Sequence, residues 1–303
     1  MARFLPALVV VALLGGSAAA FSVAERLKLE RSPIIDTKVD KEVSPTAGTP
    51  AEIAFRLRKA DRLTLAIVDG DGDVVRELVR SREVRKGAHT FRWRGRDDSG
   101  TPVPDGSYKP RVHLADEGRT ILLPNPIRVD AEAPSISLAG LNRRVFSPDG
   151  DYRFDYLKVR YRLSEPARAI LLANGRLVVK SKFFNRRVLT WTGRAAGLPR
   201  RPGRYRMQLR AVDRAGNMSV PTPVFVVRIR YIALARHVIR APAGGRIVVR
   251  VATDAHTYTW RIGSRRGRVT KRRLSLAAGP PGRYRLVVSE RGHRAHAVVL
   301  VHR

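Results

Sequence analysis

The sequence contains no cysteine, and this absence excludes several kinds of site at once. Disulfides, thiolate nucleophiles and cysteine-ligated metal centres are all ruled out. No glycine-rich loop stands between a strand pattern and a helix pattern, so a phosphate-cradling nucleotide site has no support. No serine or threonine stands in a recognisable nucleophile elbow with a histidine partner. We therefore expect a protein that is not an enzyme, with no catalytic residue and no cofactor.

Acidic residues are scarce relative to basic ones. The chain has 26 Asp and Glu against 59 Lys and Arg, which gives a formal net charge of +33 over 303 residues. Such a charge attracts polyanions, so the candidate partners are nucleic acid, anionic lipid and anionic wall polymer. Aromatic residues make up only 7% of the chain and form no base-stacking motif, which counts against specific single-strand binding. Hydrophobic residues make up 44%, as is ordinary for folded domains.

The N-terminal segment from Phe4 to Ala24 carries no charge and follows Arg3. Such a segment is a targeting signal rather than part of a fold. Two interpretations stay open: a signal peptide cleaved after the small residues Ala18 to Ala20, or an uncleaved signal anchor that spans the membrane as a helix. Basic residues follow the segment at once, which by the positive-inside rule opposes export of the body. Because long domains cross regardless of that rule, we favour an exported, extracytoplasmic protein, either membrane-anchored or secreted.

The rest of the chain consists of short runs in which apolar and polar residues alternate. In the segment from Leu157 to Leu163 every second residue is apolar and each intervening residue is Lys or Arg, the pattern of a strand with one buried face. Asn174-Gly175 between two apolar runs predicts a type I′ hairpin. Many short strands without helices between them indicate antiparallel sandwiches. The predicted fold class is all-β, with tandem immunoglobulin-like antiparallel β-sandwiches behind an N-terminal hydrophobic helix.

A motif of Trp-x-Gly followed by a turn-rich gap and Gly-x-Tyr occurs twice, one sandwich length apart. We expect each Trp to end a strand in the core, each first Gly to allow a turn and each Tyr to face inward on the next strand. The structural motif residues are Trp93, Gly95, Gly106, Tyr108, Trp191, Gly193, Gly203 and Tyr205. Trp260 and the segment from Pro281 to Leu286 suggest a third, shorter copy.

The repeats and the changes in composition predict the division of the chain. The expected segments are 1–24, a signal anchor or signal peptide; 25–50, a linker and the start of the first module; 51–131, the first immunoglobulin-like domain; 132–229, the second; and 230–303, a third, shorter β-sandwich.

The adjacent acids Asp97 and Asp98 raise the alternative of a catalytic carboxylate pair. The second copy has Ala195 and Ala196 at the matching positions while it keeps the Trp, Gly and Tyr residues. Because the acids do not repeat and the packing residues do, we interpret the acidic pair as part of a turn.

The stretch WRGRDDSGTPVPDGSYKPRV, within Val74 to Val112, resembles the immunoglobulin-like domain of the flagellar hook-capping protein, the FlgD type, a module that also occurs in exported bacterial proteins. The resemblance implies a β-sandwich used as a spacer, scaffold or assembly module. In the second copy, FSPDGDYRFDYLKVRYRLSEPARAILLANGRL and AVDRAGN are similar to immunoglobulin-like repeats of bacterial surface proteins. No segment resembles the rest of the hook-capping protein, so a flagellar role does not follow.

Two groups of acids have the spacing of calcium ligands: Asp69, Asp71 and Asp73, and Asp149, Asp151 and Asp155. We favour a hairpin tip for the first group, because Arg80 stands at the twelfth position, where an EF-hand has Glu, and strand patterns flank the group; we favour a turn for the second group as well. His293 and His296 lack a visible third zinc ligand. We therefore expect no metal site in this chain.

The positive charge follows strands on which alternation sends side chains outward. The pairs expected on solvent faces are Arg160 and Arg162, Arg206 and Arg210, Arg228 and Arg230, and Arg283 and Arg285. The densest basic segment is predicted as a loop, and its polyanion-binding candidates are Arg265, Arg266, Arg268, Lys271, Arg272 and Arg273.

Together these features predict a non-enzymatic cell-envelope protein with a structural, adhesive or assembly role. Its expected partners are an anionic envelope polymer, a lipid surface or another envelope protein, with the membrane reached through Phe4 to Ala24. The alternative is a nucleic-acid-binding protein, which the charge permits and the N-terminal segment opposes. A module that delivers an enzyme partner is a third possibility.

Overall fold

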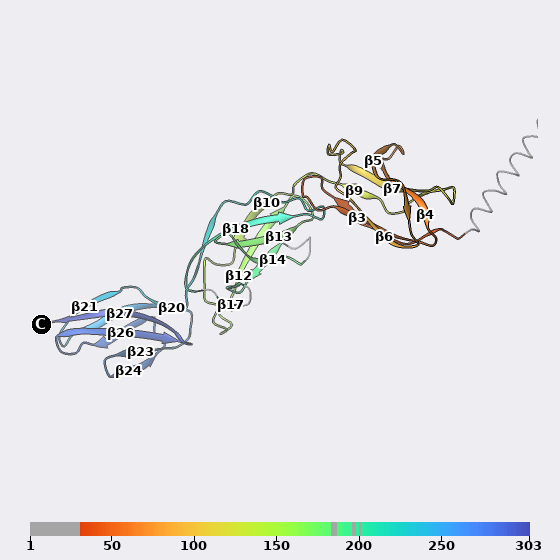
Figure 1. The fold of residues 1–303 in the computed structure, drawn as a ribbon. Helices are drawn as coiled ribbons and strands as arrows, with labels where there is room; N and C mark the ends of the chain where they lie inside the picture. The colour runs from red at the N-terminus through yellow and green to blue at the C-terminus, as the bar shows by residue number, and fades with distance from the viewer. Residues whose placement is uncertain (1–30, 183–186, 196–197, 200) are drawn as a thin grey trace, which may run out of the picture. The chain divides into compact units, whose positions relative to one another are not determined.

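A computed structural model describes residues 31–182, 187–195, 198–199 and 201–303 of the chain. Every regular element in these ranges is a β-strand (Figure 1). The all-β fold of tandem sandwiches is therefore confirmed, whereas the hydrophobic helix predicted for Phe4 to Ala24 lies outside the described residues. Within the described ranges no helix has the length and apolar character needed to cross a bilayer. The chain divides into two compact units, Met1–Ala131 and Glu132–Arg303.

The first unit contains one sandwich of two sheets. Alternation builds it: in β3 the side chains of Ile53, Phe55 and Leu57 are buried, while the residues between them are exposed or half-buried. The smaller sheet has the order β1 (Ile34–Val39), β3 (Ala51–Leu57), β6 (Gly87–Trp93). The larger sheet has the order β2 (Glu42–Val43), β9 (Ile127–Val129), β7 (Gly106–Leu114), β4 (Asp61–Val68), β5 (Val74–Val84), with β8 (Arg119–Leu122) also paired to β7.

The second unit begins with a sandwich of the same design. Its smaller sheet has the order β10 (Ile136–Leu141), β12 (Leu157–Leu163), β15 (Val188–Trp191). Its larger sheet has the order β11 (Val145–Phe146), β19 (Phe225–Ile229), β18 (Gly203–Val212), β13 (Arg168–Ala173), β14 (Arg176–Lys180). The short strands β16 (Arg194–Ala195) and β17 (Leu198–Pro199) pair with each other. Asn174 and Gly175, with φ of 50° and 75°, form the predicted two-residue hairpin between β13 and β14.

A third sandwich completes the second unit. Its smaller sheet has the order β20 (Ile232–Leu234), β22 (Arg246–Thr253), β25 (Arg273–Ala277). Its larger sheet has the order β21 (Val238–Pro242), β27 (His293–His302), β26 (Gly282–Glu290), β23 (Tyr258–Ile262), β24 (Arg265–Val269).

The three sandwiches therefore share one strand order. In each, the first strand of the larger sheet pairs in parallel with the last strand of the domain: β2 with β9, β11 with β19, and β21 with β27. The other ladders between the described strands are antiparallel. The third module is thus a full copy of the topology, although its sequence repeats only part of the motif.

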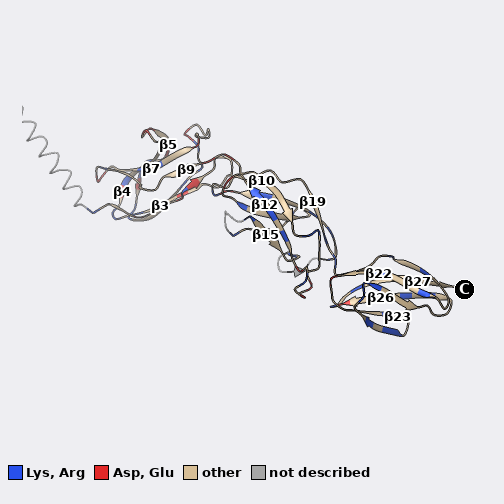
Figure 2. Cartoon of the chain, turned by 180° about the vertical axis from the view of Figure 1, so that it is seen from behind, with Lys and Arg blue, Asp and Glu red and all other residues tan. Residues whose placement is uncertain are grey.

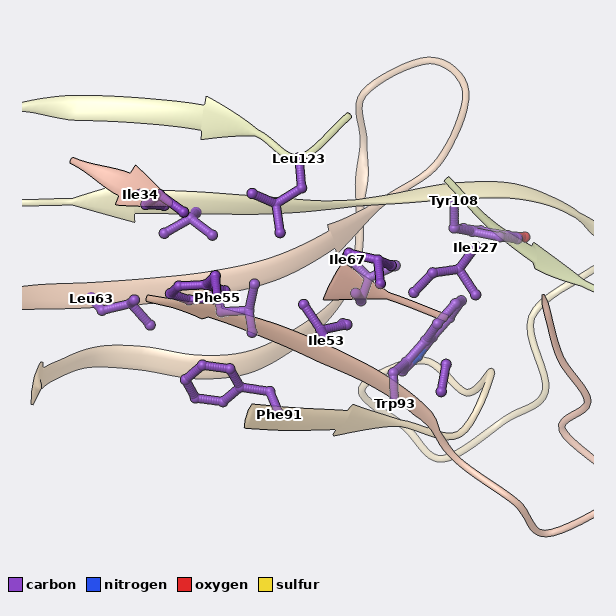
Figure 3. Packing of buried hydrophobic residues seen from close by; sticks show 14 of the residues in the cluster. Ile34, Ile53, Phe55, Leu63, Ile67, Phe91, Trp93, Tyr108, Leu123 and Ile127 are labelled. Atoms are coloured by element: carbon purple, nitrogen blue, oxygen red, sulfur yellow. The ribbon is translucent and has the colours of Figure 1, made fainter. Parts of the chain in front are cut away.

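Each sandwich has its own hydrophobic core. Figure 3 shows the first core, where Trp93 from β6 and Tyr108 from β7 point inward beside Ile127, and Phe55 lies beside Phe91. The ring centroids of Phe55 and Phe91 are 5.6 Å apart. Because both sheets contribute inward-facing residues, the core lies between the two layers, as the alternating pattern requires.

Two expectations about the third copy are wrong, because the structure places Trp260 and the basic segment in other elements than predicted. Trp260 does not correspond to Trp93 and Trp191, because it lies in β23, the counterpart of β4 and β13, while the counterpart of β6 and β15 is β25. The basic segment is not one loop: Arg265 to Val269 form the edge strand β24, a turn follows, and Arg273 begins β25. A run of exposed arginines with only one glycine is thus able to form an edge strand, where charge discourages further pairing.

Candidate functional site

The Trp and Tyr residues of the repeated motif meet in the same geometry in the first two sandwiches. Trp93 Nε1 donates to Arg96 O at 2.8 Å and Trp191 Nε1 donates to Arg194 O at 2.7 Å. The Trp93 and Tyr108 rings are 5.4 Å apart, and the Trp191 and Tyr205 rings 5.6 Å, both in edge contact. The motif therefore packs and caps a corner of the core.

The glycines of the motif allow the turns between these aromatic residues. Gly95 and Gly193 have φ of 67° and 68°, a conformation that residues with a Cβ rarely adopt. A Cβ on Gly193 would also lie 2.5 Å from Cγ of Pro148. Gly106 and Gly203 begin β7 and β18, the strands that carry the tyrosines.

A tyrosine corner recurs in all three sandwiches. Each tyrosine hydroxyl donates to the carbonyl four residues upstream: Tyr108 to Pro104 at 2.8 Å, Tyr205 to Arg201 at 2.6 Å and Tyr284 to Pro280 at 2.9 Å. This bond at the start of the strand is a hallmark of immunoglobulin-like domains. The motif residues therefore have a structural role.

The acidic pair after Trp93 is held by a turn. Asp97 Oδ1 accepts hydrogen bonds from the Ser99 hydroxyl at 2.7 Å and from Thr101 N at 2.8 Å. The hydrogen bond from Ser99 holds the pKa of Asp97 below its usual range. Asp98 Oδ1 accepts from Glu77 N at 3.1 Å and lies 3.5 Å from Arg76 Nη1. These carboxylates stabilise the loop and do not form an acid–base pair.

The first group of acids with the spacing of calcium ligands, Asp69, Asp71 and Asp73, lies at the tip of a hairpin. Asp69 Oδ1 accepts from Asp71 N and Asp73 N at 3.1 and 2.9 Å, between the ends of β4 and β5. The histidine pair is divided by the pleat: His293 stacks on Tyr231 with ring centroids 3.5 Å apart, while His296 is exposed three residues along the same strand. Burial lowers the pKa of His293.

The polyanion-binding candidates lie in four settings. Arg266 and Arg268 point to the outer face of the larger sheet, because they lie opposite the exposed Arg261 and Thr259 of β23. Arg265 is on the other face, where its Nη1 donates to Ala277 O at 2.8 Å. Lys271 and Arg272 are exposed in the turn, and Arg273 begins the smaller sheet. The structure does not unite the six residues in one patch.

The outer face of the larger sheet brings together other arginines that sequence reasoning did not connect. Registers without shifts join β24, β23, β26, β27 and β21, so the residues on this face follow from the pleat. Its basic residues are Arg240, Arg261, Arg266, Arg268, Arg283, Arg285, Arg294, His296 and His302. No Asp or Glu occupies the outward positions of these five strands, and none of the seven arginines has an ion-pair partner among the described residues. Figure 2 shows the basic residues in blue on the strands of this sandwich.

A shallow hollow of about 570 Å³ lies on this face. Arg261, Arg266 and Arg294 line it, together with Val287 and Ser289. Guanidinium groups held on β23, β24 and β27 of one sheet can each make bidentate contacts with phosphate or carboxylate oxygens. We call the outward-facing residues of β21, β23, β24, β26 and β27 the basic face.

Not all the expected solvent-facing pairs are free in solvent. Arg160 and Arg162 are exposed on β12, as predicted. Arg210 is half-buried, and its Nη1 lies 3.2 Å from Met218 Sδ. Arg230 is half-buried too, and burial lowers its pKa.

The common strand order and the tyrosine corners define a protein built from tandem immunoglobulin-like domains. Its first domain is of the FlgD type, as predicted from the sequence: residues 41–118 match the family model of the FlgD Ig-like domain. The basal-body rod modification protein FlgD of Salmonella typhimurium is 39% identical over 95 residues, which are 31% of this chain and 40% of that protein. FlgD of Escherichia coli is 33% identical over 88 residues, 29% of this chain and 37% of that protein. The chain thus spans about two fifths of the length of the curated relatives it matches.

The solved structures that this chain is similar to match with low TM-scores. Fibronectin(III)-like modules of Clostridium thermocellum CbhA match with a TM-score of 0.35 and 17% identity, over 64% of this chain and 92% of that one. FlgD from P. aeruginosa matches with a TM-score of 0.25 and 18% identity, over 43% of this chain and 89% of that one.

Proposed function

We propose that this chain is a non-enzymatic, exported protein of the cell envelope with a structural, adhesive or assembly role. The FlgD-type and immunoglobulin-like domains support a structural or assembly protein, because their described motif residues serve packing and turns. The uncharged segment Phe4 to Ala24 supports export, as a signal anchor or signal peptide. An exported chain would then bind its partner outside the cytoplasm.

The basic face carries the second part of the proposal: it binds phosphate or carboxylate groups of an anionic envelope polymer or lipid surface. The observation behind this is a five-stranded sheet face with seven arginines and no acid. Such a face has uncompensated positive charge on rigid strands, so attraction to a polyanion is not offset by internal ion pairs. Counterion release makes this binding sensitive to salt.

The test is binding of the full chain to inorganic polyphosphate and to vesicles that contain phosphatidylglycerol, between 50 and 300 mM NaCl. We expect the double variant R266E/R268E to lower affinity at least tenfold at the lowest salt and to reduce the slope of log affinity against log salt by about 2. The matched control is R160E/R162E, which makes the same charge change on two alternate, exposed arginines of β12.

Equal losses in both double variants would overturn the assignment to the basic face, since the effect would then follow net charge alone. Binding to neither probe would overturn polyanion recognition. Tighter binding to a DNA duplex than to both probes at the same salt would favour the nucleic-acid alternative.

Export has a separate test. Protease added to intact cells should digest the sandwiches and leave a membrane-held fragment that contains Phe4 to Ala24 if the segment is an anchor. Sandwiches that survive until the cells are lysed would contradict export.

A further inference from the structure

Three acidic side chains meet where the second and third sandwiches join. Asp149 comes from the loop between β11 and β12, Asp254 directly follows β22, and Glu290 ends β26. One carboxylate oxygen from each lies within 4.8 Å of the other two. Oxygens from three separate elements at this spacing could surround a single ion.

Two of these acids are buried, and one of the two has a carboxylate oxygen without a partner among the described residues. Asp254 is 8% exposed and Glu290 is 7% exposed. The buried Oδ2 of Asp254 accepts no hydrogen bond from any described residue. A buried carboxylate is costly unless it is paired, because burial removes its hydration. The orphaned oxygen of Asp254 is therefore open to a positive ligand.

Burial and mutual repulsion act on the same carboxyl groups. Burial, together with the nearby Asp149 and Asp151, raises the pKa of Asp254 to about 6, while the neighbouring Ser147 hydroxyl opposes the shift. Burial also raises the pKa of Glu290, and Asp149 and Asp254 add to the shift. The carboxylates thus repel one another when all are ionised.

Groups of the chain neutralise the cluster only in part. The Thr253 hydroxyl donates to Glu290 Oε2 at 3.4 Å, and Arg291 Nε lies 3.9 Å from Glu290 Oε1 without a hydrogen bond. Arg230 and Arg272 line the same 220 Å³ cavity as Asp254, but the buried Nε of Arg230 has no partner among the described residues either. A direct Arg230 to Asp254 ion pair after a side-chain rotation is the rival arrangement, and the experiment below separates the two.

Hydrogen bonds inside the loop that carries Asp149 hold its conformation. Asp155 Oδ1 accepts from Gly150 N at 2.8 Å and Oδ2 accepts from Tyr152 N at 2.6 Å. Asp149 Oδ1 accepts from Asp151 N at 3.3 Å, while its Oδ2 is buried without a hydrogen-bond partner among the described residues. The turn predicted for these acids therefore exists, and it presents one oxygen of Asp149 toward the third sandwich.

We propose that Asp149, Asp254 and Glu290 bind a calcium ion at the junction of the second and third sandwiches. Ca²⁺ fits because the ligand atoms are carboxylate oxygens only, they come from three separate elements, and a cavity beside Asp254 has room for water ligands. The ion would tie the Asp149 loop to the ends of β22 and β26.

The test is thermal unfolding of the full chain after chelator treatment, with and without 2 mM CaCl₂. We expect calcium to raise the Tm of the transition of residues 132–303 by about 5 °C or more, since a ligand at a hundredfold excess over its Kd stabilises the folded form. Peptide-resolved hydrogen exchange should show protection at 147–155 and 253–258.

The variant D254N gives the sharpest readout. With the orphaned charge removed, we expect its Tm without calcium to be unchanged or higher than that of the wild type, and its calcium response to be lost. A folding defect cannot produce that combination. The matched control D69N/D71N alters the exposed hairpin of the first sandwich and should keep the full response.

Several results would overturn the site. They are no Tm shift with calcium in the wild type, a shift that persists in D254N, or an equal shift with MgCl₂, which would exclude a calcium preference. A lower Tm of D254N without calcium would show that Asp254 is paired with Arg230 instead.

Discussion

The first and third sandwiches have the same strand order but arrange their charged residues in opposite ways: the first pairs them, and the third leaves most of its described arginines without acids. Among the described residues the first has six ion pairs: Arg56–Asp36, Lys59–Glu117, Arg62–Asp116, Arg76–Asp98, Arg80–Glu77 and Arg92–Glu52. The third contains one described pair, Glu290 with Arg291, while the arginines of its basic face stand without acids. Since both fold to one topology, the topology does not depend on how surface charge is arranged. The charge of the third sandwich is therefore not needed to set its strand order.

The two sandwiches also differ in how they use tryptophan. Trp93 is 2% exposed in the first core, whereas Trp260 is half-buried and covers the edge-strand glycine Gly267. A Cβ on Gly267 would lie 2.8 Å from Trp260 Nε1, so the ring occupies the space that a side chain would take. What the two domains share is the tyrosine corner of Tyr108 and Tyr284. The corner, rather than the Trp, is common to all three copies.

The largest expected difference concerns these tryptophans. W93A should lower the free energy of unfolding of the first sandwich by about 3 to 5 kcal/mol, because it leaves a cavity in the core. W260A should cost the third sandwich about 1 to 2 kcal/mol, since the ring is only half-buried. Urea-dependent hydrogen exchange, followed on peptides of each sandwich in the full chain, measures both. Equal losses would mean that Trp260 belongs to the core.

A smaller effect is expected at the tyrosine corner, which the two sandwiches share. Y108F and Y284F each remove one hydroxyl-to-carbonyl hydrogen bond, which should cost about 1 kcal/mol. The loss at Tyr108 should be the greater, because its hydroxyl is part-buried while that of Tyr284 is exposed. The same exchange measurement applies, with Y152F at the exposed Tyr152 as the control. A neutral Y108F would contradict the corner as a stabilising element.

Salt should produce the smallest effect and one of opposite sign in the two domains. Raising NaCl from 0.1 to 1 M screens the exposed ion pairs of the first sandwich and should lower its stability by under about 1 kcal/mol. The third sandwich should become slightly more stable, because repulsion among its arginines is screened. Urea unfolding at the two salt concentrations checks this. A loss of stability in the third sandwich would show that its arginines are paired in solution.

Much of the fold could be predicted because it is encoded locally. The alternation of Leu157 to Leu163 gives β12 its buried and exposed faces, and Asn174-Gly175 gives the hairpin its positive φ values. The turn around Asp97 follows from short polar side chains that bond their own backbone.

The misplaced features depend on pairing between distant segments. The pattern around Trp260 resembles the repeat, but only the pairing of β23 with β26 shows which strand it belongs to. The basic face joins residues from Arg240 to His302 through four ladders, and no local run of the sequence contains it. The junction cluster likewise needs Asp149 and Glu290 to meet across two domains. The local sequence identifies each acid, but it does not identify the distant residues that lie beside it in the fold.

The parallel ladder that closes each sandwich also has a mechanical consequence. In the third sandwich β21 and β27 pair in parallel over five residue pairs, from Val238 with Val298 to Pro242 with His302. The corresponding ladders of the first and second sandwiches have two pairs each. Once β20 has been peeled away, a pull on the two ends of this domain loads all the bonds of the ladder together in shear, instead of opening them one at a time. If the chain bears load as a tether, the third sandwich, which has the longest parallel ladder, should therefore resist unfolding by force best.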